Sequence, residues 1–161
     1  MDLHEILVKS TVRIGSPNLF THGTGFYIDE ETIITCYHCI QEFNLSKIPI
    51  KKGDKDGEAV YFESPYSIEY DIALLKTELK NKNALFLQEG IEPNDSVVIY
   101  GYSDENPNGD SVGLECEGLS FDANENELIK FRNGKIRKGH SGSPIFNLNS
   151  GSIVGLIKET S

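Results

Sequence analysis

Short runs of apolar and β-branched residues recur along the whole chain, separated by polar segments rich in Gly, Asn, Asp and Pro. Each run is too short for a typical helix and suits a strand. Strands of this kind at regular spacing predict an all-β sandwich or a pair of barrels, rather than alternating strands and helices. The runs lie at 11–14, 25–29, 32–35, 59–63, 71–76, 96–102, 112–118, 128–131, 144–148 and 152–157.

The polar segments between these runs predict the exposed loops and the boundary between two structural units. One helical turn is expected directly after His38, in residues 39–43. Residues 77–83 contain helix formers but no apolar face, so they are interpreted as part of a linker. The chain then divides into an N-terminal unit, a linker and a C-terminal unit, at 1–79, 80–92 and 93–161. Exposed loops are expected at 51–58, 103–111 and 122–127.

The charge balance and the cysteines narrow the classes of function. Among 161 residues, 25 acidic and 15 basic side chains give a formal net charge of −10, which argues against a nucleic-acid or anionic-membrane partner. The 3 cysteines cannot all pair within the chain, and residues 1–15 contain no apolar run of signal-peptide length. The sequence also lacks an apolar stretch long enough for a transmembrane helix. These features predict a reducing, cytoplasmic setting.

Three polar side chains, far apart in the sequence, suit one reaction. His38 follows the apolar run 32–35, Asp71 begins another apolar run, and Ser141 lies between glycines in GHSGSP. A buried aspartate needs a hydrogen-bond donor, and a histidine N–H is a suitable one. Together they predict nucleophilic catalysis, in which Ser141 attacks, His38 takes its proton and Asp71 orients His38. The N–H groups of Gly139 and Ser141 are the expected oxyanion donors.

These motifs resemble those of the trypsin/chymotrypsin-like serine proteases. GTGFYIDEETIITCYHC (23–39) is similar to the family's Gly-Ser-Gly-Phe strand and Thr-Ala-Ala-His turn, and DIALLK (71–76) to its Asp-hydrophobic-Ala-Leu-Leu strand. GHSGSPIFN (139–147) is similar to Gly-Asp/Asn-Ser-Gly-Gly-Pro and is most like the bacterial glutamyl endopeptidase and HtrA-like branches. The resemblance implies an all-β fold of two antiparallel six-stranded β-barrels with the catalytic groups between them. It also implies endopeptidase activity on protein or peptide substrates without a metal or cofactor.

The resemblance further implies which residues bind the substrate. They should line the primary specificity pocket and pair with the substrate backbone as an added strand. Lys135 aligns with the pocket floor, where a lysine would favour an acidic substrate side chain. Glutamyl endopeptidases, however, carry a pocket histidine at the position of Ile157. The residues expected to bind substrate are Lys135, Lys138, Ile157, Lys158 and Glu159.

The chain departs from the family pattern in three places. His140 stands where exported relatives have an aspartate that pairs with a newly cut N-terminus. The usual disulfide partner position of Cys39 is Gly23, so the Cys39 thiol is expected to be free. The family's final strand and C-terminal helix have no counterpart before Ser161 and are expected to be missing.

Alternative interpretations remain for the cysteines and for the function. Cys36-x-x-Cys39 around His38 is a weak zinc motif, because the nearest further ligands would be His22 and Cys116; buried free thiols are the better expectation. The α/β-hydrolase order needs a histidine after the serine, and no histidine follows His140. A subtilisin-like order could use the HGT at 22–24, but the chain lacks the matching aspartate and serine motifs. An inactive or latent protease-fold module that binds protein partners is the rival function. A further alternative is an effector domain of a larger bacterial signalling or defence protein.

Overall fold

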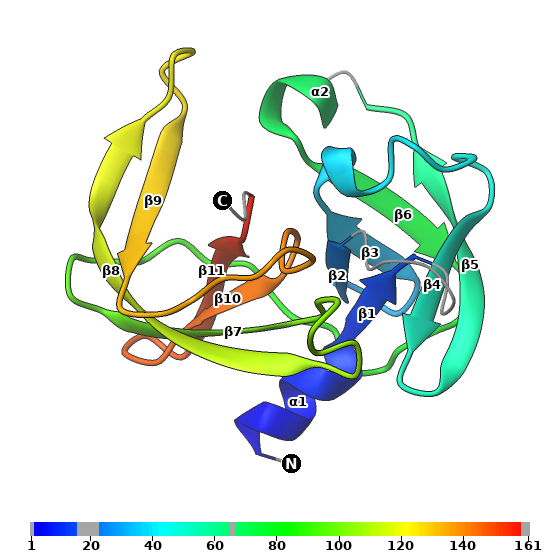
Figure 1. Ribbon diagram of the computed structural model, residues 1–161, viewed down its shortest axis with the longest axis horizontal. Helices are drawn as coiled ribbons and strands as arrows, with labels where there is room; N and C mark the ends of the chain where they lie inside the picture. The colour runs from blue at the N-terminus through cyan, green and yellow to red at the C-terminus, as the bar shows by residue number, and fades with distance from the viewer. Residues whose placement is uncertain (1, 16–22, 65–66, 159–161) are drawn as a thin grey trace.

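The computed structural model describes residues 2–15, 23–64 and 67–158. It consists of two β units side by side, with a short N-terminal helix packed below them (Figure 1). The N-terminal strands are β1 (Thr11–Ile14), β2 (Gly23–Tyr27), β3 (Thr32–Thr35), β4 (Ile48–Lys52), β5 (Lys55–Phe62) and β6 (Ala73–Thr77). The C-terminal strands are β7 (Ser96–Gly101), β8 (Asp110–Phe121), β9 (Glu127–Arg132), β10 (Pro144–Asn147) and β11 (Ser152–Leu156). The helical elements are α1 (Leu3–Ser10), the 3₁₀ turn η1 (Tyr37–Cys39) and α2 (Ser67–Tyr70).

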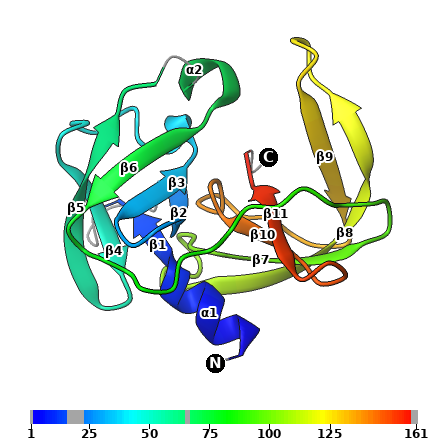
Figure 2. The same cartoon turned by 180° about the vertical axis from the view of Figure 1, so that it is seen from behind.

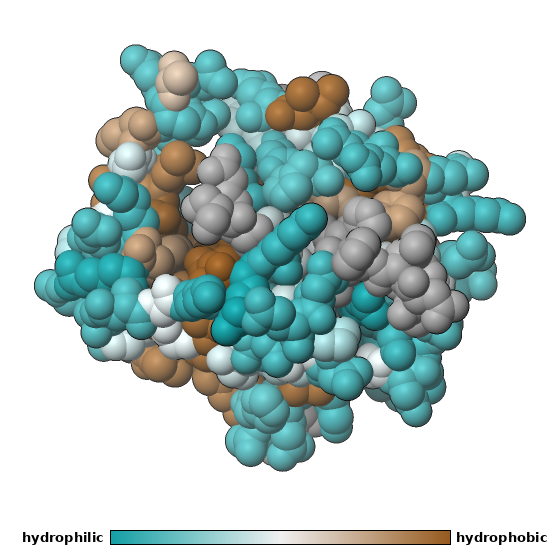
Figure 3. Space-filling view, viewed as in Figure 1, coloured by the Kyte–Doolittle hydropathy of each residue, from teal (hydrophilic) through white to brown (hydrophobic). Residues whose placement is uncertain are grey.

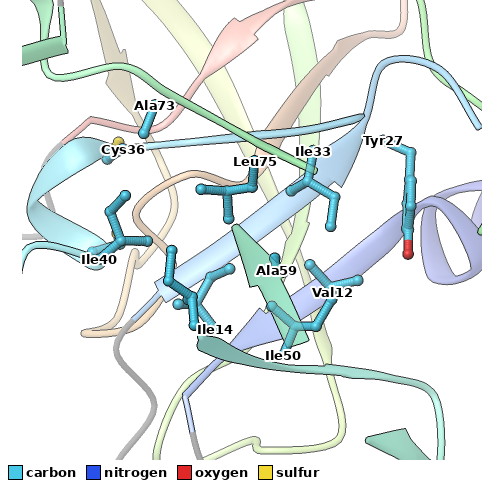
Figure 4. Close-up of a cluster of buried hydrophobic side chains, with 12 residues drawn as sticks. Val12, Ile14, Tyr27, Ile33, Cys36, Ile40, Ile50, Ala59, Ala73 and Leu75 are labelled. Carbon is cyan, nitrogen blue, oxygen red and sulfur yellow. The ribbon is translucent and has the colours of Figure 1, made fainter. Parts of the chain in front are cut away.

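The N-terminal unit is a closed six-stranded barrel with the strand order β1-β2-β3-β6-β5-β4. Every neighbouring pair is antiparallel, and closure leaves no unpaired sheet edge. β-Branched and aliphatic residues fill the interior, because they fit a pleated, buried surface. Figure 4 shows this core, which includes Val12, Ile14, Ile33, Ile50 and Leu75.

The C-terminal unit is a five-stranded antiparallel sheet with the order β11-β10-β7-β8-β9. Its separate apolar cluster contains Val97, Ile99, Leu114, Ile145 and Ile157. The view from behind shows the long β8–β9 hairpin rising from the base of this sheet, opposite α2 of the barrel (Figure 2). The predicted fold class is therefore confirmed, with a closed barrel beside a curled sheet that has five strands among the described residues.

Two local elements differ from the sequence-based expectation. Residues 51–58, expected as an exposed loop, form most of the β4–β5 hairpin, which turns at Gly53 with φ 61°. Most residues of the segment 51–58 are charged, so it has no apolar pattern to detect, whereas the end of β5 lies in the expected run 59–63. Helix α1 was also not expected; Asp2 caps its start by accepting from the Glu5 N–H at 2.9 Å. It buries Leu7 between the two units.

The linker joins the units by backbone contacts. The Leu85 N–H donates to the Tyr27 carbonyl at 2.9 Å, and Leu87 bridges Ile153 of β11. These contacts fix the position of the two units relative to each other, at the crevice where the candidate residues lie.

The described part of the chain contains no helix with the length and apolar character needed to cross a bilayer.

Candidate active site

His38 lies in the 3₁₀ turn η1, directly after β3. The expected helical turn thus includes His38 rather than following it. Strand β3 pairs with β6, so Thr35 is opposite Ala73 and the residues just before β6 come beside the turn. Asp71, expected to open that strand, lies two residues before it with φ 54°. Aspartate tolerates this left-handed conformation better than most residues do.

His38 and Asp71 are joined by two hydrogen bonds. The His38 backbone N–H donates to Asp71 Oδ1 at 2.8 Å, and His38 Nδ1 lies 2.5 Å from Asp71 Oδ2. A carboxylate only accepts, so Nδ1 carries the proton and Nε2 is left as the proton acceptor. This bond, with a further contribution from the Cys39 thiol, raises the pKa of His38 above its ordinary value. The side chain of His38 is 41% exposed and that of Asp71 is 19% exposed, so the base is open to the crevice.

The serine loop depends on the two glycines that flank it. Gly139 has φ 105° and Gly142 has φ 90°, in a region that residues with a side chain rarely adopt. A Cβ on Gly142 would lie 1.9 Å from the Thr24 carbonyl oxygen. Glycine is therefore required after Ser141 both for the backbone conformation and for its close approach to β2.

The N-terminal barrel anchors this loop. The Thr24 N–H donates to the Ser141 carbonyl at 2.8 Å, and Thr24 Oγ1 donates to the Gly139 carbonyl at 2.9 Å. The Cys39 thiol also lies 3.6 Å from the Ser141 carbonyl, which places the serine backbone beside the residue that follows His38. Sequence reasoning missed Thr24, although it lies within the GTGF motif used for the resemblance.

The backbone N–H groups of Gly139 and Ser141 and the Ser141 hydroxyl have few hydrogen-bond partners within the described chain. The N–H groups of Gly139 and Ser141 donate to no acceptor in residues 2–15, 23–64 and 67–158. Within these described residues, no acceptor occupies the two donors. No hydrogen bond in the same residues joins Ser141 Oγ to His38, and Ser141 is 3% exposed. The structure thus brings His38 into contact with Asp71, and brings the Ser141 backbone close to that pair.

His140 closes the turn that presents Gly139. Its N–H donates to the Arg137 carbonyl at 3.1 Å, and its Nδ1 accepts from the Arg137 N–H at 2.9 Å. The ring is fully buried, which lowers the pKa of His140. Its Nε2 lies 3.8 Å from Asp110 Oδ2 and has no hydrogen-bond partner among the described residues. Here the chain places a buried imidazole beside Asp110, the first residue of strand β8.

A cavity of about 720 Å³ opens next to Asp71, between the barrel and the C-terminal sheet. Figure 3 views this side of the molecule and shows hydrophobic residues exposed left of its centre. Of the five expected substrate-binding residues, Ile157 and Lys158 line the cavity, whereas Lys135 and Lys138 are exposed elsewhere and Glu159 lies outside the described residues. Most of the lining is apolar and includes Ile72, Phe131, Ile136, Ile145 and Leu156.

The cysteines are free and buried, as expected. A Cβ on Gly23 would lie 2.4 Å from Cys39 Sγ, so Gly23 does occupy the facing position. Cys36, His38 and Cys39 offer ligand atoms within 4.8 Å of one another and form the one candidate metal cluster in the described part of the chain. Cys116 is not part of that cluster, and His22 lies outside the described residues.

Comparisons with solved structures agree with this architecture. The Rv3671c protease, in a structure titled as its inactive form, has a TM-score of 0.79 and 23% identity, covering 98% of this chain and 80% of that one. The MamO protease domain from Magnetospirillum magneticum has a TM-score of 0.75 and 17% identity, covering 99% of this chain and 89% of that one. Deg5 has a TM-score of 0.77 and 21% identity, covering 98% of this chain and 83% of that one. At these identities the likeness concerns the fold.

Comparison with curated proteins found no match. A family model described as a trypsin-like peptidase domain matches residues 23–156, which include barrel strands β2–β6, the C-terminal sheet and all three residues of the candidate triad. The fold, the order of the motifs and this match agree: the chain belongs to the trypsin-like peptidase domain family.

Proposed function

We propose that the protein is a serine endopeptidase in which Ser141, His38 and Asp71 act as the catalytic triad. The observation that carries the proposal is the pair of hydrogen bonds between Asp71 and His38, at 2.8 and 2.5 Å. They hold the imidazole as the Nδ1–H tautomer with Nε2 facing away from the carboxylate. Only that tautomer accepts the proton of a serine hydroxyl at Nε2.

The remaining roles follow from the chemistry of acyl transfer. Ser141 Oγ attacks the scissile carbonyl while His38 takes its proton, and Asp71 stabilises the resulting imidazolium. The N–H groups of Gly139 and Ser141 then donate to the oxyanion of the tetrahedral intermediate. His38 returns the proton to the leaving amine, and water releases the acyl group by the same steps in reverse order.

The proposed substrate is an extended protein segment with an apolar side chain in the cavity. Apolar residues form most of the cavity wall, and burying one aliphatic or aromatic side chain there contributes about 1.5–3 kcal/mol. An acidic side chain is less favoured, because Arg137 pairs with Glu105 and the two lysines that line the cavity, Lys130 and Lys158, share it with Asp71, Asp122 and Glu127. Cleavage of a peptide library tests this directly; a preference for Asp or Glu before the scissile bond would contradict it.

A catalytically inactive or latent module that binds proteins is the second candidate. It is favoured by the burial of Ser141 and by the absence of a hydrogen bond from its hydroxyl to His38 within the described residues. Such a closed state would need a rearrangement of the loop before catalysis. Membership in a larger bacterial signalling or defence protein, and the cytoplasmic setting, stay predictions.

Labelling with a serine-directed fluorophosphonate separates the two candidates. The active enzyme incorporates one probe, located at Ser141 by peptide mapping, and the Ser141→Ala variant incorporates none. Ser143→Ala is a matched control, because Ser143 is equally buried in the same loop but has no proposed role in the reaction. A folded protein that is not labelled, with no cleavage of casein or of a peptide library, would support the binding module instead.

A further inference from the structure

Cys36 and Cys39 are reactive side chains that the proposed mechanism does not use. They lie at the two ends of the turn that carries His38, where the Cys39 N–H donates to the Cys36 carbonyl at 3.1 Å. A turn closed in this way keeps its end Cα atoms within about 7 Å. Disulfides form at Cα separations of about 4.4–6.8 Å. The two Sγ atoms are already within 4.8 Å of each other.

Each thiol contacts a different segment of the C-terminal unit. Cys36 Sγ donates to the Ile157 carbonyl at 3.2 Å, next to the substrate cavity that Cys36 itself lines. Cys39 Sγ donates to the Ser141 carbonyl at 3.6 Å. Figure 4 shows Cys36 at the edge of the barrel core, beside Ala73. The reduced thiols therefore help to hold both the serine loop and the substrate strand against the barrel.

The two sulfurs belong to one turn and lie within 4.8 Å of each other. In such a pair one sulfur can attack an oxidant and the other can resolve the product. Cys116, in strand β8, belongs to a separate part of the fold.

We propose that Cys36 and Cys39 are a reversible oxidation site, at which a hydroperoxide closes a disulfide and switches the peptidase off. The loss of activity rests on the proposed function; the disulfide does not. Cys36 lines the cavity, and hydrogen peroxide is small enough to enter the cavity and meet this residue. No thiol outside this turn takes part.

The oxidation balances in two steps. One thiol loses its proton, the resulting thiolate attacks one peroxide oxygen, the O–O bond breaks, and the departing oxygen takes up that proton and leaves as water, giving a sulfenic acid. The second thiol then attacks this sulfur, the S–S bond forms, the S–O bond breaks, and a second water leaves with the proton of the second thiol. The two thiols lose two electrons and the peroxide gains them. A reducing dithiol restores both thiols by exchange.

The disulfide changes the site because it removes both S–H donors. The sulfurs move to the bonded separation of about 2.05 Å, and the carbonyls of Ser141 and Ile157 lose their thiol partners. His38 lies between the two cysteines, so its ring shifts relative to Asp71. A misplacement of about 1 Å in a catalytic group costs about 10²-fold in rate. We expect fluorophosphonate labelling to slow by about this factor.

The experiment treats the full chain with hydrogen peroxide in a buffer containing a metal chelator. Intact mass and peptide mapping should show the loss of two hydrogens and a Cys36–Cys39 link, and labelling should slow and then recover with dithiothreitol. Cys116→Ser should behave like the original protein. Cys36→Ser should not lose two hydrogens and should show no dithiothreitol-reversible disulfide.

The outcomes separate the inference from the proposed function. If the linked protein is labelled as fast as the reduced protein, or if the link never forms, the redox site is refuted. If the reduced protein is not labelled at all, the proposed function fails. In that case the redox site is judged by the mass change and by hydrogen exchange near Ser141 and Ile157. Exchange there should rise on oxidation, and unchanged exchange in the linked protein would overturn the inference.

Discussion

Thr24 offers a sharp test of how the fold supports the serine loop. Its side chain is fully buried in β2. Its Oγ1 donates to the Gly139 carbonyl at 2.9 Å and accepts from the Tyr102 N–H at 2.9 Å. The substitution Thr24→Val keeps the shape and the β-branched backbone preference but removes both hydrogen bonds. Its effects therefore report on the hydroxyl alone.

The cost to stability follows from the two backbone groups that lose their partner. Each unsatisfied buried group costs about 1–3 kcal/mol, so the free energy of unfolding should fall by about 2–6 kcal/mol. Thr77 provides a matched control, since its Oγ1 donates to the Glu58 carbonyl at 2.8 Å and accepts from the Leu79 N–H at 3.1 Å. Thr77 is also buried, but in β6 and away from Gly139. Thr77→Val should also destabilise the fold, by a smaller amount, because its two hydrogen bonds are only partly buried.

Activity should distinguish the two variants. Only Thr24→Val frees the Gly139 carbonyl, so the Gly139–His140 peptide loses its anchor. This peptide lies between the two peptides that carry the proposed oxyanion donors, the N–H groups of Gly139 and Ser141, and its movement displaces them. Complete loss of one such donor costs about 10²–10³-fold in kcat, and displacement should approach the lower figure. We would measure urea midpoints for stability, and kcat and KM with a peptide substrate at a temperature where both variants are folded. Equal kcat values for Thr24→Val and Thr77→Val would refute the proposed coupling.

Three further outcomes are expected. Asp71→Asn should lower kcat by about 10⁴-fold without unfolding the protein, as measured by steady-state kinetics and circular dichroism. Asp71 raises the pKa of His38, and only the neutral imidazole accepts a proton. The value of kcat/KM should therefore fall as the pH is lowered through the pKa of His38, which lies above the ordinary value of about 6.5. A flat profile of kcat/KM from about pH 5 to 8 would contradict this. Gly142→Ala should abolish fluorophosphonate labelling and lower Tm strongly, because the added Cβ meets the Thr24 carbonyl. Gly151→Ala is the control: the added Cβ has open space around it, so the substitution should cost only backbone strain of about 1–2 kcal/mol.

The strands were predictable where burial imposes a local pattern. The run 32–35 coincides with β3, and the run 11–14 coincides with β1. The second half of β5 lies in the expected run 59–63, but residues 51–58 of the β4–β5 hairpin escaped prediction, because backbone pairing holds these mostly charged residues. Helix α1 escaped because its eight residues give too short a window to distinguish one apolar face from a strand.

The residues of the candidate site were also partly predictable from local sequence patterns. Asp71 and His38 were named from residue type and position, and their contact follows from the pairing of β3 with β6. The expected pocket residues Lys135 and Lys138 do not line the cavity. Their place depends on the course of the loop before Gly139, which no local pattern describes.

By itself, the sequence determined the all-β class, most strand positions and the identities of the reactive side chains, because these depend on near neighbours and on side-chain chemistry. Tertiary structure alone decided that Thr24 holds the Gly139 carbonyl, 115 residues away, and that Cys36 meets the Ile157 carbonyl, 121 residues away. Such contacts form only when two separately folded units pack together, and hydrogen bonds depend on distances of a few tenths of an ångström that residue order does not specify.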